Sequence, residues 1–326
     1  MLFNYNLLWI KCFRVYRSPV YNMALKWMQG VVICLVVIVT SLAVLLTSPL
    51  QTNTALASFG KSIQAGLRGR SMAETLRSVR LLCWVMTMPS NLQKKARYVR
   101  ETWGKRCDVL LFFSSVENKA LSVIGLNVSE GRSHLTDKTY HAFRYVYKHY
   151  FNQADWFLKA DDDTYVIVDN LKFYLSKFDK NQGLYFGATF SRFTPQGYNS
   201  GGAGYVLSKE ALKRFGERGS NKTACPYKGG IEDAAVGHCM YNLGVKLVNT
   251  LDKKNRTRFH AYHPLTHMEA GDKYLNSVSA YGYRTGAMNI SDLPLTFHYI
   301  QGRNMKAVEF YLYHVRHVGD GGTVLT

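Results

Sequence analysis

Short apolar runs and segments of helical spacing alternate along most of this chain. The short runs, which predict buried strands, are residues 80–86, 109–113, 156–160 and 185–187. The segments whose apolar residues recur at helical spacing are 92–103, 136–151, 170–178 and 234–243. Such alternation predicts an α/β fold with helices packed against a sheet.

One apolar run differs from the others because it is long and carries no charge. Residues 27–46 are uncharged, and about 20 such residues span the hydrocarbon core of a bilayer. The residues before this run include Lys11, Arg14, Arg17 and Lys26 but no acidic residue, which predicts a cytosolic N-terminus. A cleaved signal peptide is the alternative, although the run is long and starts late. We therefore expect a single-pass type II signal anchor.

Composition divides the chain into five predicted parts. These are a cytoplasmic tail at 1–26, the anchor at 27–47, a luminal stem at 48–79, a folded domain at 80–318 and a C-terminal tail at 319–326. The stem is predicted because residues 48–79 are rich in small and polar side chains, which favour a flexible linker.

The net charge of +19 invites a nucleic-acid interpretation. Part of this charge lies in the tail and the stem, and a luminal domain would not meet nucleic acid. We therefore expect no nucleic-acid partner. The basic surface favours an anionic substrate or, near the tail, acidic lipid.

Sequons agree with a luminal folded domain. They begin at Asn127, Asn221, Asn255 and Asn289, all on the side that is predicted to be luminal.

Cysteines outside the tail and the anchor form an even set, which is expected to pair in an oxidising lumen. This set is Cys83, Cys107, Cys225 and Cys239. Close spacing favours Cys83–Cys107 and Cys225–Cys239, although four cysteines permit three connectivities. A zinc site is the alternative, and the absence of Cys-x-x-Cys spacing disfavours it.

Three consecutive aspartates, Asp161, Asp162 and Asp163, follow the predicted strand 156–160 directly. Adjacent carboxylates repel one another, and a divalent cation with oxygen ligands removes that repulsion. The carboxyl end of a strand in an open α/β sheet is also where such folds bind ligands. A solvated acidic turn is the simpler alternative, which the flanking apolar residues disfavour.

A carboxylate metal site in the secretory lumen suggests a nucleotide-sugar transferase, in which a divalent ion neutralises the diphosphate leaving group. Asp161 and Asp163 alternate along an extended segment, so both can face one ion while Asp162 faces elsewhere or contacts ribose. His298, which follows an apolar run, is the best candidate among the histidines for a third ligand. Mn²⁺ suits oxygen ligands with one imidazole.

An inverting transfer also needs a general base near the acceptor hydroxyl. Glu232 and Asp233, which precede a predicted helix, are the leading candidates, although carboxylates there can simply cap the helix. Residues 201–207 contain three glycines and Tyr205. These glycines, including Gly202, would let the backbone approach a ligand or the metal loop, and a tight turn into a buried strand explains them equally well. Ser208 is predicted to cap the helix that follows.

Several motifs together resemble those of the core 1 β1,3-galactosyltransferases (T-synthases) of glycosyltransferase family 31. They include Trp-Phe-Leu-Lys-Ala-Asp-Asp-Asp-Thr-Tyr-Val at 156–166 and Gly-Tyr-Asn-Ser-Gly-Gly-Ala-Gly-Tyr-Val-Leu at 197–207. Further matches lie at 81–87, 94–103, 231–233 and 297–299. The resemblance implies a GT-A, Rossmann-like catalytic domain that uses UDP-galactose and Mn²⁺ to modify GalNAc-α-Ser/Thr of glycoproteins. It also implies a Golgi membrane location, and by family analogy a homodimer.

The resemblance carries roles over to individual positions. It implies Asp161, Asp163 and His298 as metal ligands and Asp233 as catalytic base. It further implies donor contacts by Glu130, Gly131, Arg132 and Lys138, and it supports both favoured disulfides. We assign Asp162 to the donor side of the site, and Gly202, Tyr205 and Glu232 to the acceptor side or its loops.

Two departures from the family pattern bear on the acceptor. Family members have an adjacent cysteine pair before the Ser-Asp that precedes the strand of His298, whereas this chain reads Ala-Met-Asn-Ile-Ser-Asp at 287–292. The aromatic, Pro-rich acceptor segment is also altered at 281–286. The alternatives are a family-31 transferase with another donor or acceptor, and a non-catalytic, chaperone-like paralogue. A non-catalytic protein has no physical need for Asp161, Asp163 and Asp233 together.

Overall fold

The computed structural model describes residues 71–226, 231–282 and 285–315. The predicted tail and anchor, most of the stem and residues 319–326 lie outside these ranges. Within them, no helix combines the length and apolar character that a membrane crossing requires. The last residues of the predicted stem form helix α4 (Met72–Ser78), none of whose side chains is buried.

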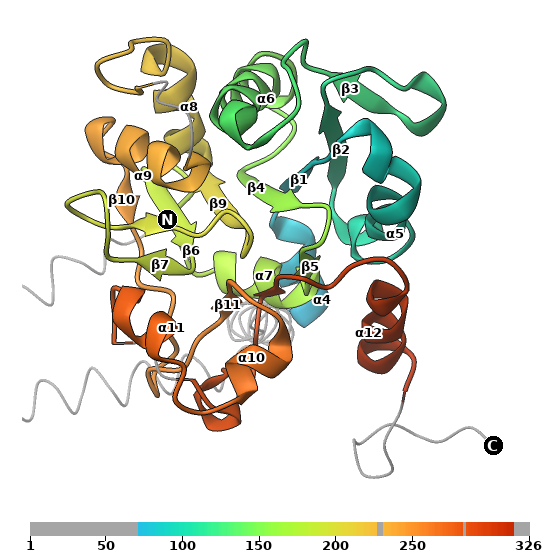
Figure 1. The fold of residues 1–326 in the computed structure, drawn as a ribbon, viewed down its shortest axis with the longest axis vertical. Coiled ribbons are helices and arrows are strands. Elements are labelled where there is room, and N and C mark those ends of the chain that lie inside the picture. Colours follow the sequence, from blue (N-terminus) through green and yellow to red (C-terminus); the bar gives the residue numbers. More distant parts are fainter. Residues whose placement is uncertain (1–70, 227–230, 283–284, 316–326) are drawn as a thin grey trace, which may run out of the picture. The chain divides into compact units, whose positions relative to one another are not determined.

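A seven-stranded sheet forms the centre of the domain, in the order β10-β6-β9-β4-β1-β2-β3 (Figure 1). Its strands are β1 (Leu81–Met86), β2 (Val109–Ser114), β3 (Val123–Gly125), β4 (Trp156–Asp161), β6 (Leu184–Gly187), β9 (Tyr205–Ser208) and β10 (Lys246–Leu247). The neighbours are parallel except at β9, which runs antiparallel to both β4 and β6.

Two small sheets flank the central one. One joins β11 (Phe259–His260), β12 (Thr296–Phe297) and β5 (Tyr165–Val166). The other is a hairpin of β7 (Thr189–Phe190) and β8 (Tyr198–Asn199). Because β5 follows β4 directly and pairs with β12, this pairing brings the C-terminal part of the chain beside the predicted metal loop.

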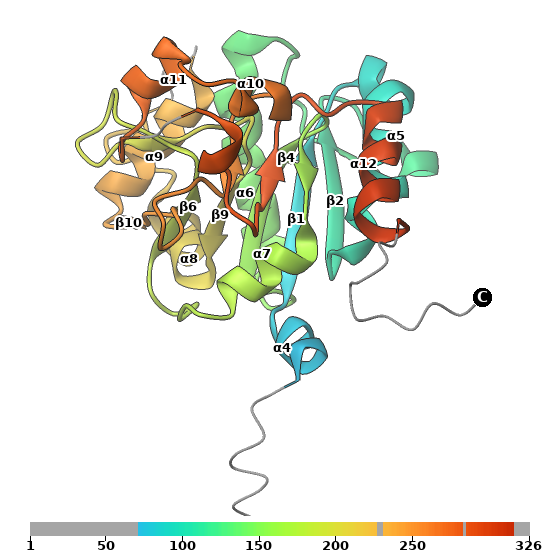
Figure 2. The same cartoon turned by 90° about the horizontal axis from the view of Figure 1, so that it is seen from below.

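Helices cover the central sheet. The longer ones are α6 (Leu135–Tyr150), α7 (Val168–Leu175), α8 (Lys209–Arg218), α9 (Glu232–Asn242) and α12 (Arg303–Tyr313). Three shorter ones are α5 (Arg97–Glu101), α10 (Pro264–Met268) and α11 (Lys273–Val278). Figure 2 shows α4 at the end of the sheet where β1 begins, and α10 and α11 at the opposite end.

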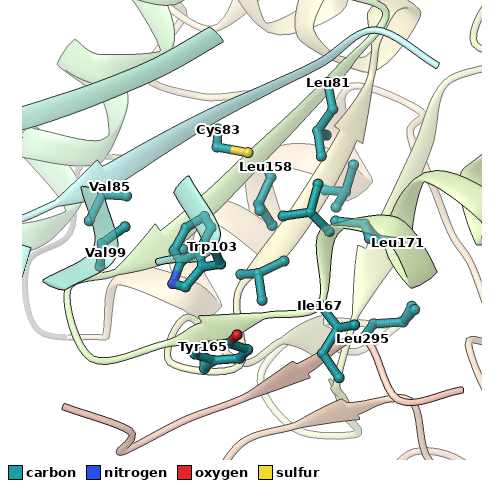
Figure 3. Packing of buried hydrophobic residues seen from close by; sticks show 14 of the residues in the cluster. Leu81, Cys83, Val85, Val99, Trp103, Leu158, Tyr165, Ile167, Leu171 and Leu295 are labelled. Atoms are coloured by element: carbon teal, nitrogen blue, oxygen red, sulfur yellow. The ribbon is translucent and has the colours of Figure 1, made fainter. Parts of the chain in front are cut away.

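Alternate residues of β1 enter two different hydrophobic clusters, as strand geometry requires. Leu81, Cys83 and Val85 pack with residues of α5, α7 and α12 (Figure 3). Leu82 and Trp84 pack with residues of α6, α8 and α9. All six residues of β1 are buried, so the sheet is covered on both faces. The predicted α/β class is therefore confirmed.

Element boundaries differ from the predictions where side chains have tertiary roles. The predicted helix 92–103 is a π-helical turn (Leu92–Ala96) followed by α5, and a 3₁₀ turn then begins at Trp103. The strand predicted at 156–160 extends to Asp161. Ser208 caps α8 as expected, since its Oγ accepts a hydrogen bond of 3.1 Å from the Ala211 amide.

Both favoured cysteine pairs are confirmed as disulfides. Cys83–Cys107 ties β1 to the segment before β2, and Cys225–Cys239 ties the segment after α8 to the middle of α9.

Candidate functional site

A cleft of about 660 Å³ opens where β1 and β4 end. Its walls include the loop after β1, the aspartate turn after β4, the glycines before β9 and the start of α9. The segment after β12 completes it. The sheet thus brings together residues far apart in sequence, at the end where open α/β sheets bind ligands.

Three predicted ligands converge in this cleft. One ligand atom each from Asp161, Asp163 and His298 lies within 4.8 Å of the others. His298 Nδ1 is 2.9 Å from the carbonyl oxygen of Ala261, which orients the ring so that Nε2 lies 3.2 Å from Asp163 Oδ1. A carbonyl partner on Nδ1 leaves Nε2 as the ligating nitrogen. Two carboxylates and one imidazole suit Mn²⁺ or a similar hard cation.

The glycines before β9 are explained by close packing against these groups. A Cβ on Gly202 would overlap the imidazole of His298, and a Cβ on Gly201 would lie 2.8 Å from Glu232 Oε2. Gly204 has a φ of +73°, which favours glycine. Both interpretations of this segment therefore hold, since it is a tight turn that also approaches the candidate metal site.

Two lysines that the sequence analysis missed neutralise the aspartates. Lys159 Nζ lies 2.6 Å from Asp161 Oδ1, and Lys95 Nζ lies 2.8 Å from Asp163 Oδ2. Burial raises the pKa of Asp163, but hydrogen bonds from His298 and Lys95 outweigh it and hold this pKa at about 2. A lysine inside an apolar strand, two residues before Asp161, was a usable signal for Lys159. Lys95 gave no such signal.

Asp162 points away from the three candidate ligands, as the alternation predicts. Its Oδ2 accepts hydrogen bonds from Thr87 Oγ1 at 2.7 Å and Asn91 Nδ2 at 3.0 Å. The side chain is buried, and this burial raises the pKa of Asp162 to about 6 against the opposing hydrogen bond from Thr87. Asp162 therefore holds the loop after β1 in place beside the cleft.

The predicted donor residues divide into a buried pair and an exposed arginine. Lys138 Nζ, fully buried, donates to Glu130 Oε2 at 2.8 Å and to the Thr87 carbonyl at 3.0 Å. Burial raises the pKa of Glu130, and hydrogen bonds from Lys138 and Ser115 lower it below its usual value. Arg132 is exposed and lines the cleft, and Gly131 precedes it with a φ of +115°.

Glu232 and Asp233 begin α9 but face different surroundings. Glu232 Oε1 accepts 2.8 Å hydrogen bonds from Thr139 Oγ1 and from the buried Tyr205 Oη, which makes both Glu232 and Tyr205 parts of the packed wall.

Asp233 lines the cleft, and its two carboxylate oxygens accept from the amides of Gly201 and Ala234 at 3.1 and 2.9 Å. Burial is the main cause that raises the pKa of Asp233, which favours proton acceptance.

The sequons differ in exposure. Asn127, Asn221 and Asn255 are exposed, whereas Asn289 is half-buried and its Nδ2 donates to the Thr285 carbonyl at 3.0 Å. In the altered segment, Met288 is 83% exposed on a 3₁₀ turn (Ala287–Asn289). Residues 283–284 of that segment lie outside the described ranges.

Comparison with known proteins identifies the family. The profile of the Fringe-like family matches residues 80–302, which is most of the described domain. The chain belongs to the Fringe-like family.

Two proteins of similar sequence make the assignment more specific. Glycoprotein-N-acetylgalactosamine 3-beta-galactosyltransferase 1 of Xenopus laevis is 43% identical over 252 residues, which are 76% of this chain and 70% of that protein. The beta-1,3-glucosyltransferase of Mus musculus is 24% identical over 47% of this chain and 31% of that protein. The expected T-synthase family and galactosyltransferase class are therefore confirmed.

A solved structure of low sequence identity also matches this chain. The galactosyltransferase LgtC in complex with donor and acceptor sugar analogues gives a TM-score of 0.40 at 12% identity, over 72% of this chain and 98% of that chain.

Proposed function

We propose that this protein is an inverting GT-A transferase that moves galactose from UDP-galactose, in β1,3 linkage, to GalNAc-α-Ser/Thr of glycoproteins. The observation that carries the proposal is that Asp161, Asp163, His298 and Asp233 line a single cleft. The activity named for the Xenopus laevis relative supports this donor sugar and this acceptor.

In this proposal Asp161, Asp163 and His298 hold Mn²⁺, which supplies charge neutralisation for the leaving diphosphate. Arg132 is exposed in the cleft and is suited to pair with a phosphate oxygen. Lys138, Glu130 and Asp162 contribute by fixing the loops that receive the nucleotide, since their polar atoms already bind the protein.

Asp233 acts on the acceptor. Its carboxylate accepts the proton of the acceptor 3-hydroxyl while that oxygen bonds to the anomeric carbon of galactose. The bond from this carbon to the diphosphate oxygen breaks, and UDP leaves with the electron pair. Amide hydrogen bonds from Gly201 and Ala234 hold the carboxylate in one orientation, which suits a general base.

There are two alternatives to this function: a transferase with another donor or acceptor, and a protein without transferase activity. The relationship to a beta-1,3-glucosyltransferase favours testing other nucleotide sugars. A non-catalytic, chaperone-like role would leave the convergence of Asp161, Asp163 and Asp233 in one cleft without a reason.

The proposal includes the location of the protein. We place the catalytic domain (80–318) in the Golgi lumen behind a stem at 48–79 and a type II anchor at 27–47, with a homodimer by family analogy. Protease protection of the full chain in microsomes tests this topology: a protected luminal domain is expected, and its digestion without detergent contradicts the proposal.

A donor and acceptor panel tests the activity. Full-length protein, purified in detergent, should release UDP from UDP-galactose with a GalNAc-α-threonine peptide and Mn²⁺. It should release much less in chelator, or when the peptide lacks GalNAc. Equal turnover in chelator would refute the metal-assisted mechanism, and preference for another sugar nucleotide would refute the proposed donor.

A further inference from the structure

Two aromatic residues of the cleft have an unfavourable backbone conformation. Phe193 has a φ of +66° and Tyr299 a φ of +58°, in the left-handed region that bulky residues avoid. The other non-glycine residues with positive φ in the described ranges are Ser122, Asn127 and Asn255. Those three are small and polar, so only the two cleft residues are aromatic. Such conformations are strained and cluster at ligand-binding sites.

Phe193 lies on a well-fixed loop between β7 and β8. The loop is held to α11 by a 2.8 Å hydrogen bond from the Ser191 amide to the Val278 carbonyl. It is held to β10 through Gln196, whose side chain accepts from the Leu247 amide at 3.2 Å. Even so, Phe193 is 62% exposed at the cleft. Neither burial nor loop flexibility therefore explains its conformation.

Tyr299 separates two residues with fixed roles. His298 before it faces the candidate metal site, and Ile300 after it is buried, with its amide bonded to the Asp163 carbonyl at 2.9 Å. The ring of Tyr299 stacks on the imidazole of His298, with centroids 3.9 Å apart, and the residue remains 47% exposed. The left-handed turn therefore keeps an aromatic ring at the cleft surface beside the metal ligands.

Two chemically different groups of residues line the cleft. One is charged, with Arg132 and the ion pair of Lys138 with Glu130. The other is aromatic, with Tyr198 beside Phe193, Tyr262 beside Tyr299, and Tyr274, and Arg192 precedes Phe193 there. The ring of Phe193 lies 5.8 Å from that of Tyr198. Burial raises the pKa of Tyr198, and the next largest cause is the nearby carboxylate of Asp233. Helix α9, which carries Asp233 in its first turn, packs against Tyr198, since a Cβ on Gly237 would lie 2.3 Å from Tyr198 Cβ. The aromatic group therefore lies beside the helix that carries the candidate base.

We propose that Phe193 and Tyr299 are specificity-determining residues of the acceptor site, where their rings bind the apolar face of the acceptor sugar and the adjoining peptide. This inference rests on the proposed function. Pyranose rings present C–H groups on one face, and these pack against aromatic rings, while hydroxyl groups on the edges bind polar groups. The acceptor hydroxyl must lie next to Asp233, and the charged group of Arg132, Lys138 and Glu130 suits the nucleotide.

Substitutions at Phe193 test the proposal, because this residue lies on the loop between β7 and β8, which carries none of the candidate metal ligands. Phe193→Asn removes the ring and suits the left-handed conformation, Phe193→Ala removes the ring alone, and Phe193→Trp keeps an aromatic face. Phe310→Ala is the matched control, since Phe310 is 54% exposed on α12 and is not among the residues that line the cleft. The measurements are KM for GalNAc-α-threonine peptide, KM for UDP-galactose, and Tm of the full-length protein.

We expect Phe193→Asn and Phe193→Ala to raise the acceptor KM by roughly five- to tenfold, the effect of losing one aromatic contact. Their donor KM should stay at the wild-type value, and Phe193→Trp and Phe310→Ala should resemble the wild type. Phe193→Asn should also raise Tm, because asparagine relieves the backbone strain. An unchanged acceptor KM in Phe193→Asn, or an equal rise in both KM values, would overturn the proposal.

Tyr299 needs a different control because it contacts His298. Tyr299→Asn should weaken binding of the acceptor peptide and leave the affinity for UDP with Mn²⁺ unchanged. Loss of the affinity for UDP with Mn²⁺ would instead assign Tyr299 to the metal site. If the wild type transfers no galactose at all, the proposed function fails. Calorimetric titration of the GalNAc-peptide into the wild type and into Phe193→Asn then tests the aromatic acceptor site without relying on transfer. Weaker binding by Phe193→Asn is expected. Equal affinities of the two proteins, or no binding by the wild type, would overturn the acceptor site.

Discussion

The ammonium of Lys159 lies 2.6 Å from Asp161 Oδ1, 3.2 Å from the Gly201 carbonyl oxygen and 4.0 Å from Glu232 Oε2. Its side chain is only 4% exposed. Burial lowers the pKa of Lys159, but the carboxylates of Asp161 and Glu232 outweigh this and raise it, so the group stays charged. One buried cation therefore links a candidate metal ligand to the residue before the candidate base.

Lys159→Met should destabilise the protein, because it leaves the buried Glu232 and the partly buried Asp161 without their counter-charge. We expect the free energy of unfolding, measured in urea, to fall by about 3 kcal/mol. Adding Glu232→Gln should restore part of this loss. Lys213→Met is the control, since Lys213 is 48% exposed in a surface pair and should change stability by under about 0.5 kcal/mol. If Lys159→Met is as stable as the wild type, the ion pairs of Lys159 with Asp161 and Glu232 contribute nothing to the free energy of unfolding.

Gly202→Ala should displace the His298 imidazole, because the added methyl group overlaps the ring. We expect Mn²⁺ affinity, titrated by electron paramagnetic resonance, to weaken roughly 10–100-fold, as happens when a ligand's supporting contacts are lost. His298→Ala should give a loss of similar size. A Gly202→Ala protein that binds Mn²⁺ like the wild type would remove His298 from the proposed ligands.

Asp233→Asn should reduce transfer while UDP binding is retained. Asparagine preserves the shape of the side chain but cannot accept the acceptor proton, so kcat should fall by roughly 10²–10⁴. Asp169→Asn serves as the control, because Asp169 lies in the first turn of α7 and its side chain is 45% exposed. If UDP binding is lost together with turnover, Asp233 has a structural role rather than a catalytic one.

Acid should destabilise the protein through two buried histidines. Burial lowers the pKa of His260 to about 3 and that of His267 to about 4, and their rings lie 4.9 Å apart. A histidine in the unfolded chain has a pKa near 6.5, so the unfolded state binds more protons at lower pH. Stability is therefore complete above about pH 6.5 and falls as the pH drops towards 4.

Each of these histidines should contribute about 1.4 kcal/mol per pH unit below the unfolded pKa. Urea unfolding of His267→Gln at pH 7.5 and pH 5.5 measures this contribution. The variant should lose less stability between the two values than the wild type, since glutamine can still accept the Tyr262 amide hydrogen bond and does not titrate. If both proteins lose the same stability between pH 7.5 and pH 5.5, His267 is not buried in its neutral form.

The sequence predicts the metal loop better than its surroundings. The alternation of side chains along an extended segment predicted that Asp161 and Asp163 lie on one side and Asp162 on the other. This prediction needs only local backbone geometry. The hydrogen bond from Lys138 to the Thr87 carbonyl was not predictable, because the two residues are 51 positions apart and meet only through the packing of α6 beside the loop after β1. Likewise, helical spacing at 92–103 did not indicate the π-helical turn that presents Lys95 to Asp163.

The different partners of Asp162 and Asp163 limit which sequence changes this turn can accept. Asp162 accepts hydrogen bonds from Thr87 and Asn91, whereas Asp163 lies against His298. Lys95 Nζ lies 2.8 Å from Asp163 Oδ2 and 3.7 Å from Asp162 Oδ1. Insertion or deletion of one residue within 161–163 would exchange these partners, even if the number of carboxylates were unchanged. Among natural variants, the turn should therefore accept some changes of side chain, but in-frame changes of length there should be absent from functional alleles.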